Sequence, residues 1–111
     1  MGYKDKYPFK TIPSDKFSFR ILLSGYYHVI YVDKHKDAKG FQIDDRTNGT
    51  TLFTTKLDYT DDFTPFTINT VINVQTHNGF GHSDIRLRTI TDTSILKGKG
   101  YNTFYIKYLH S

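Results

Sequence analysis

Apolar and polar side chains alternate along most of this chain. Between Lys16 and Leu23, every odd-numbered residue from Phe17 onward is apolar, whereas Ser18 and Arg20 are polar. A period of two residues places the two sets of side chains on opposite faces of an extended strand. Glu is absent and Ala occurs once, so helix-forming residues are scarce. The sequence therefore predicts an all-β protein and excludes a helical bundle.

Seven segments have this strand pattern, and Gly, Asn or Asp residues separate most of them. Short strands at near-regular spacing predict an antiparallel β-sandwich of the immunoglobulin-like or jelly-roll kind, with a small OB-like barrel as the alternative. A chain of 111 residues is long enough for one such domain. The predicted strands are Lys16 to Leu23, Tyr26 to Val32, Phe41 to Arg46, Thr50 to Leu57, Phe66 to Gln75, Ile85 to Thr91 and Tyr101 to Leu109.

The segment Tyr26 to Val32 is unusual because both of its faces are apolar. Tyr27, Val29 and Tyr31 form one face, and the other holds Tyr26, Ile30 and Val32 beside His28. Strands that are buried on both sides have this composition, so we predict a central position in a sheet. The segment that begins at Phe66 alternates more cleanly, with Val71 as the one apolar residue on its outward face.

Two predicted strands flank the turn Thr47-Asn48-Gly49, and the length of the loop decides their register. A two-residue Asn-Gly turn would place Ile43 beside Thr54. A three-residue loop, with Gly49 in the left-handed conformation, places Ile43 beside Phe53 and gathers the apolar residues on one face. We predict the three-residue loop.

Residues 1–13 precede the first predicted strand. Their apolar side chains lie outside the alternating pattern, and Pro8 and Pro13 favour an extended backbone. We predict an extended N-terminal arm that contacts a neighbouring chain, followed by a single sandwich domain over residues 14–111. The predicted partner contacts are Tyr3, Tyr7, Phe9 and Ile12 in the arm and Phe80 in a later loop.

Charge and cysteine content limit the location and the partners of the protein. The chain has 15 Lys and Arg residues and 11 acidic residues, but cations and carboxylates alternate instead of clustering. It has no Cys, its N-terminus lacks the pattern of a signal peptide, and no apolar run is long enough to span a membrane. We expect a protein of the cytoplasm or of a virus particle that contacts no membrane.

The segment Thr76 to Asp84 contains two histidines and a carboxylate. His77, His82 and Asp84 are candidate metal ligands, or a general base and its orienting group in a hydrolase. Their spacing matches no standard metal motif, and no further ligand or nucleophile can be placed beside them. A glycine-rich surface loop is the interpretation that we prefer. We expect no catalytic residues, no metal and no cofactor.

Aromatic and cationic residues interleave between Tyr101 and Tyr108, a pattern that suits the stacking of single-stranded nucleic acid. The nine Tyr and nine Phe residues must, however, also fill a core without Trp. We therefore keep nucleic-acid binding as an alternative. Its predicted contact residues are Arg86, Arg88, Lys97 and Lys99.

The function that we expect is a non-enzymatic structural or adhesive module of a larger homo- or hetero-oligomeric assembly. A compact β domain with Tyr- and Thr-rich faces and open sheet edges can act through protein or glycan contacts. Its size, lack of cysteine and fold class suit a phage capsid-decoration, tail or fibre part. The alternatives are a single-stranded nucleic-acid-binding barrel and a small metal- or histidine-dependent hydrolase.

Overall fold

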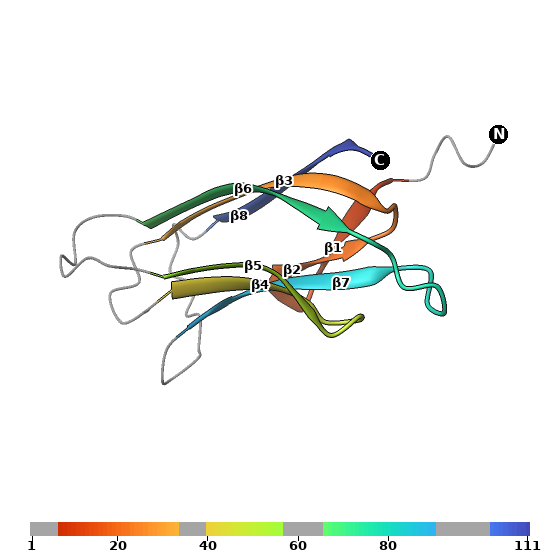
Figure 1. Cartoon of the computed structure of the whole chain (residues 1–111), viewed down its shortest axis with the longest axis horizontal. Helices are drawn as coiled ribbons and strands as arrows, with labels where there is room; N and C mark the ends of the chain where they lie inside the picture. Colours follow the sequence, from red (N-terminus) through yellow and green to blue (C-terminus); the bar gives the residue numbers. More distant parts are fainter. Residues whose placement is uncertain (1–6, 34–39, 57–65, 91–102) are drawn as a thin grey trace.

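The computed structural model describes residues 7–33, 40–56, 66–90 and 103–111, which form a five-stranded and a three-stranded sheet stacked face to face (Figure 1). No helix occurs among these residues, and the sheets do not close into a barrel. The predicted antiparallel β-sandwich is confirmed, and the barrel alternative is wrong. The strands are β1 (Phe9–Ile12), β2 (Asp15–Ile21), β3 (Gly25–Asp33), β4 (Gly40–Asp45), β5 (Thr50–Lys56), β6 (Phe66–Val74), β7 (Ser83–Thr89) and β8 (Thr103–His110).

The order of the strands is β1-β2-β7-β4-β5 in one sheet and β6-β3-β8 in the other. β2 pairs with β7, β3 with β6, and β4 with β5. Such nested pairs result when one long antiparallel hairpin is rolled up, which is the arrangement of a jelly roll. Of the two kinds of sandwich that the sequence predicts, the pairing fits the jelly roll. β1 departs from this scheme because it pairs with β2.

All seven predicted strands are present, and the register of the β4–β5 hairpin is confirmed. Ile43 lies beside Phe53, and Gly49 adopts a φ of 72°. The loop is one residue longer than predicted because Asp45 pairs with Thr50. A β-bulge at Leu52 compensates for the extra residue. As a result, two consecutive side chains of β5, Leu52 and Phe53, both pack against the core.

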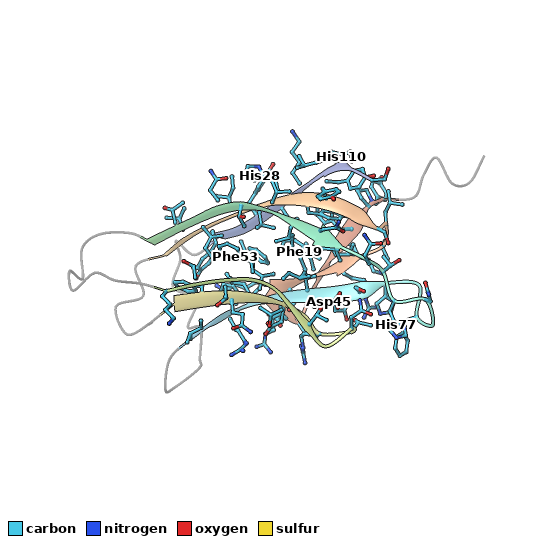
Figure 2. The ribbon with its side chains drawn as sticks, viewed as in Figure 1. Phe19, His28, Asp45, Phe53, His77 and His110 are labelled. Atoms are coloured by element: carbon cyan, nitrogen blue, oxygen red, sulfur yellow. The ribbon has the colours of Figure 1, made fainter. Side chains whose placement is uncertain are left out.

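The core between the two sheets combines aromatic rings with Ile, Val and Leu side chains, and Figure 2 shows Phe19 and Phe53 pointing into this space. Tyr31 of β3 is fully buried, and its ring contacts Phe41 of β4 and Phe104 of β8 in edge-to-face geometry. These rings join the three-stranded sheet to the five-stranded sheet. Aromatic side chains thus supply much of the core volume, as their abundance predicts.

The strand β1 lies within the segment predicted to be an extended arm. It pairs antiparallel with β2, and the ring of Phe9 lies 5.7 Å from that of Phe19 and 6.1 Å from that of Tyr27. Phe9 therefore packs against the core of its own chain, and the sandwich has eight strands where the sequence predicts seven. The strand is too short for its alternation to stand out between Pro8 and Pro13.

The hydroxyl of Tyr27 forms hydrogen bonds that join the start of β3 to the segment before β1 and to the β2–β3 connection. It donates to the carbonyl oxygens of Leu23, at 2.6 Å, and Pro8, at 3.0 Å, and burial raises the pKa of Tyr27. We expect Tyr27→Phe to lower the free energy of unfolding by about 1 kcal/mol, because the partly buried hydrogen bond to the Leu23 carbonyl is lost, whereas the Pro8 carbonyl keeps its backbone donors. Urea unfolding measures this change. The control Tyr26→Phe alters an exposed ring and should change nothing; equal losses would contradict the assignment.

Candidate functional site

The outer surface of the three-stranded sheet holds large apolar side chains that remain exposed. Tyr105 is 53% exposed and Val71 is 52% exposed. Ile30 lies beside Tyr105 on the neighbouring strand, whereas Val71 lies beside His28 and Tyr26 beside Asn73, so apolar and polar groups are interspersed on this surface. We call this surface the apolar face and define it by Tyr26, Ile30 and Val32 of β3, Val71 of β6, and Tyr105 and Leu109 of β8.

Basic and amide groups accompany the apolar face. His28 lies between Val71 and Lys107 on the two neighbouring strands, and its Nε2 forms a hydrogen bond with Asn69. The ring of His110 lies 4.9 Å from that of Tyr26 (both histidines are labelled in Figure 2). The carboxylates whose side chains are described all belong to the five-stranded sheet, so none of them lies on this face: Asp15, Asp44, Asp45 and Asp84.

The outer surface of the five-stranded sheet has the opposite character, because its arginines are paired with carboxylates. Nε of Arg86 lies 3.4 Å from Asp15, and Nε of Arg88 lies 2.6 Å from Asp44. Both arginines are predicted nucleic-acid contacts, and this pairing reduces the positive potential that a phosphate would meet. Nucleic-acid binding stays a prediction. The surface is charged, and both of these arginines lie in ion pairs.

A third arginine of this surface, Arg20, makes the stability of the folded protein dependent on pH. Arg20 donates two hydrogen bonds to Asp84, at 2.8 and 3.1 Å, and thereby holds the pKa of Asp84 below its usual range. A carboxyl whose pKa is lowered in the folded state stabilises the fold above its ordinary pKa and loses this effect as the pH falls. We expect Arg20→Gln to be less stable than the wild type near neutral pH.

That difference should disappear in acid, where Asp84 is protonated in both proteins. Urea unfolding at about pH 7 and at about pH 2 measures it. Arg20→Lys keeps the positive charge but not the forked geometry of the guanidinium group. Its free energy of unfolding near neutral pH should therefore lie between those of the wild type and Arg20→Gln. A stability difference that is the same at both pH values would show that Arg20 acts through packing instead.

A buried carboxylate organises the loop between β4 and β5. Asp45 is 2% exposed and accepts hydrogen bonds from the backbone amides of Thr47 and Asn48 and from the Asn48 side chain. Nδ2 of Asn48 also lies 2.9 Å from the carbonyl oxygen of Gln75 and 3.1 Å from Oγ of Ser83. These contacts join the loop to the end of β6 and to β7. In the sequence, the only sign of this cluster is the Asp-x-x-Asn spacing of Asp45 and Asn48, which is typical of a turn.

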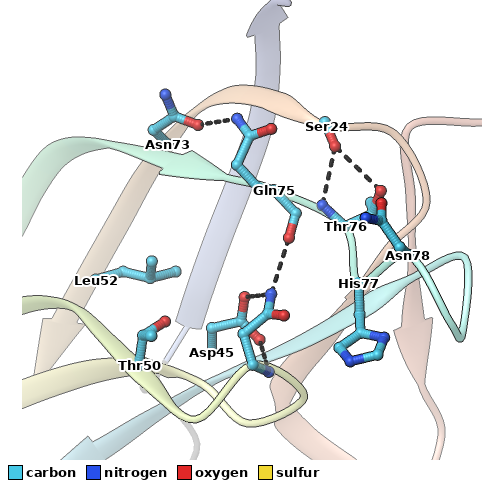
Figure 3. Close-up of a pocket in the computed structure, with 10 residues that line it drawn as sticks. Ser24, Asp45, Thr50, Leu52, Asn73, Gln75, Thr76, His77 and Asn78 are labelled. Atoms are coloured by element: carbon cyan, nitrogen blue, oxygen red, sulfur yellow. Dashed lines mark hydrogen bonds between the residues drawn. The ribbon is translucent and has the colours of Figure 1, made fainter.

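A pocket of about 660 Å³ lies beside this loop, between the ends of the two sheets (Figure 3). Its walls come from the β2–β3 connection, the β4–β5 loop, β5 and the end of β6. Nothing in the sequence predicts it, because its residues are widely separated and each is typical of a turn or a surface. The lining residues are Ser24, Asp45, Asn48, Thr50, Leu52, Asn73, Gln75, Thr76, His77 and Asn78.

The predicted histidine loop follows β6. His77 and His82 form an isolated β-bridge, and the ring of Phe80 lies 4.8 Å from that of His77 and 5.9 Å from that of His82. The third predicted residue, Asp84, is bound by Arg20. The loop thus brings the two imidazoles together around an aromatic ring, and Asp84, although bound by Arg20, is near enough to His82 for that side chain to contribute to the lowering of the pKa of Asp84. Within the described residues, no three His, Cys, Asp or Glu side chains form a group that could hold a metal ion.

Of the other predicted contact residues, Tyr7 and Phe80 are described and exposed. Tyr7 is 75% exposed at the start of the described chain, and Phe80 is 66% exposed in the loop after β6. Tyr3, Lys97 and Lys99 lie outside the described residues. A contact of these residues with a partner stays a prediction.

No family model matches this chain, and neither a curated protein nor a solved structure matches it. In the part of the chain that the structure describes, no helix could cross a lipid bilayer. The class of protein is therefore defined by its fold and surfaces: an antiparallel β-sandwich with jelly-roll pairing, one charged outer surface and one apolar outer surface.

Proposed function

We propose that this protein is a non-catalytic contact module that binds another protein through its apolar face. The difference between the two outer surfaces supports this proposal most strongly. A sheet surface that faces solvent can carry paired charges, as that of the five-stranded sheet does. Exposed apolar groups that lie close together are, in contrast, typical of binding sites. Tyr26 and Tyr105 add the aromatic character that is enriched at the centre of protein interfaces.

Charge identifies the kind of partner. The apolar face has Lys107 and His28 beside it and no described carboxylate, so a complementary surface would be apolar with Asp or Glu residues around it. A second copy docked face to face would bring like cations together. The partner is therefore a different protein chain.

The size of the face favours an assembly with many repeated contacts. Nine-residue strands are about 30 Å long, and three of them span about 15 Å, so one partner would lose only about 500 Å² of surface. This area is at the lower end for specific interfaces. Repeated copies strengthen such contacts by avidity. A virus particle is the assembly that we propose, because jelly rolls also build viral capsid domains, an argument from fold analogy.

Photocrosslinking in the cells that naturally produce the protein tests this proposal. Benzoylphenylalanine is placed at position 105 on the apolar face and, as the control, at position 54 of β5 on the other sheet. The proposal expects one crosslinked protein from position 105, rich in surface carboxylates, and none from position 54. Crosslinks that are absent, equal at the two positions, or only to a second copy of this chain would overturn it.

A further inference from the structure

Most of the residues that line the pocket between the sheet ends carry uncharged hydrogen-bonding groups, and polar and apolar atoms both contribute to its surface. Asparagine, glutamine, serine and threonine side chains make up most of its wall, together with one carboxylate and one imidazole. Among the described residues, no Lys or Arg lines it. Pockets for drug-like ligands are mainly apolar, so this lining favours a ligand that has many hydroxyl groups and no charge.

Several of these groups are held in place and still have unused hydrogen-bonding capacity. Nε2 of Gln75 donates to Oδ1 of Asn73, which leaves Nδ2 of Asn73 as a donor and Oε1 of Gln75 as an acceptor. Figure 3 shows this pair at one side of the pocket, with Thr50 and Asp45 at the other. Donors and acceptors on both sides can bind hydroxyl groups, which both donate and accept.

The base of the pocket is preorganised by Asp45. Its carboxylate accepts three hydrogen bonds within the β4–β5 loop, and no described cation forms an ion pair with it. A buried anion of this kind disfavours phosphate or carboxylate ligands, and its hydrogen bonds hold the Asn48 side chain in place at the wall of the pocket. Leu52 and the ring of His77 supply the apolar surface on which the C–H groups of a sugar ring can pack.

We propose that this pocket binds an uncharged hexose unit of a carbohydrate. Its volume of about 660 Å³ lies in the range of small-molecule sites. None of the residues that define the apolar face lines the pocket, although the lining residue Asn73 lies beside Tyr26. The proposed site adds a glycan ligand to the protein contact proposed above, and either can fail without the other.

Amide NMR spectra of the full chain test this proposal with glucose, galactose, mannose and N-acetylglucosamine. Each sugar is added at about 10 mM, which loads a site of millimolar affinity. At least one should shift the signals of Thr50, Gln75 and Asn78 in a saturable way. Glucuronate and inorganic phosphate, which are charged, should bind about tenfold more weakly or not at all.

Two variants localise the effect without disturbing the fold. Thr50→Val and Asn78→Ala alter exposed side chains, and each should weaken binding of the sugar about tenfold by removing a hydrogen-bonding group. Thr54→Val, at another exposed position of β5, is the matched control and should bind like the wild type. The proposal is overturned if none of the four sugars shifts these signals, if a charged probe binds more tightly, or if all three variants bind alike.

Discussion

Replacing Asp45 with alanine is expected to lower the free energy of unfolding by about 3 kcal/mol. The carboxylate is buried and accepts from the backbone amides of Thr47 and Asn48, which then lose their partner. The Asn48 side chain, which also contacts β7 and the end of β6, loses its anchor. Asp45→Asn keeps one acceptor oxygen and should lose about half as much. Urea unfolding monitored by tyrosine fluorescence measures both variants.

The neighbouring residue supplies the control for this prediction. Asp44 is also a carboxylate of β4, but it lies on the outer surface and pairs with Arg88. Asp44→Ala should cost about 1 kcal/mol, because the donors that it leaves behind, on Gln42, Thr51 and Arg88, are side chains at the surface that water can solvate. If Asp44→Ala and Asp45→Ala lower the free energy of unfolding by similar amounts, the burial of Asp45 is unimportant and other contacts hold the loop.

The double replacement Tyr105→Ser with Lys107→Glu should weaken binding of the crosslinked partner about 100-fold or more. The first change removes a large aromatic group of the apolar face, on the edge strand β8 beside Ile30, and the second turns an attractive charge into a repulsive one. Both side chains are exposed, so the stability of the free protein should hardly change. Titration calorimetry with the purified partner measures the affinity.

Lys56→Glu is the charge-matched control, because it makes the same charge change at an exposed position of β5. It should bind the partner like the wild type. If it weakens binding as much as the double replacement does, net charge and not the apolar face governs the contact. A Tyr105→Ser, Lys107→Glu protein with unchanged affinity would contradict the role of the face.

The sequence predicts those features of the fold that are determined by residues close together in the chain. Alternation locates seven strands, and the choice of partner for Ile43 fixes the core register of the β4–β5 hairpin. It does not predict that β2 pairs with β7 or β3 with β6, because these contacts join distant segments through the shared core. The bulge at Leu52 and the short strand β1 also escape a pattern of strict alternation.

The candidate site is only partly predictable for the same reason. The two apolar faces of β3 correctly place it at the centre of a sheet, but only the structure distinguishes the buried face of Tyr27 from the exposed face of Tyr26. Val71, the one exception in the alternation of β6, belongs to the exposed face. The pocket depends on residues between Ser24 and Asn78 that only the folded chain brings together.

Hydroxyl-radical footprinting tests most directly whether the apolar face is covered by another protein. Oxidation rates of individual side chains are compared between the purified protein and the same protein in its native assembly. Tyr26 and Tyr105 should be oxidised much more slowly in the assembly, whereas Leu23, an exposed residue outside the face, should react at the same rate in both. Equal rates for Tyr26 and Tyr105 in the two samples would contradict the proposal.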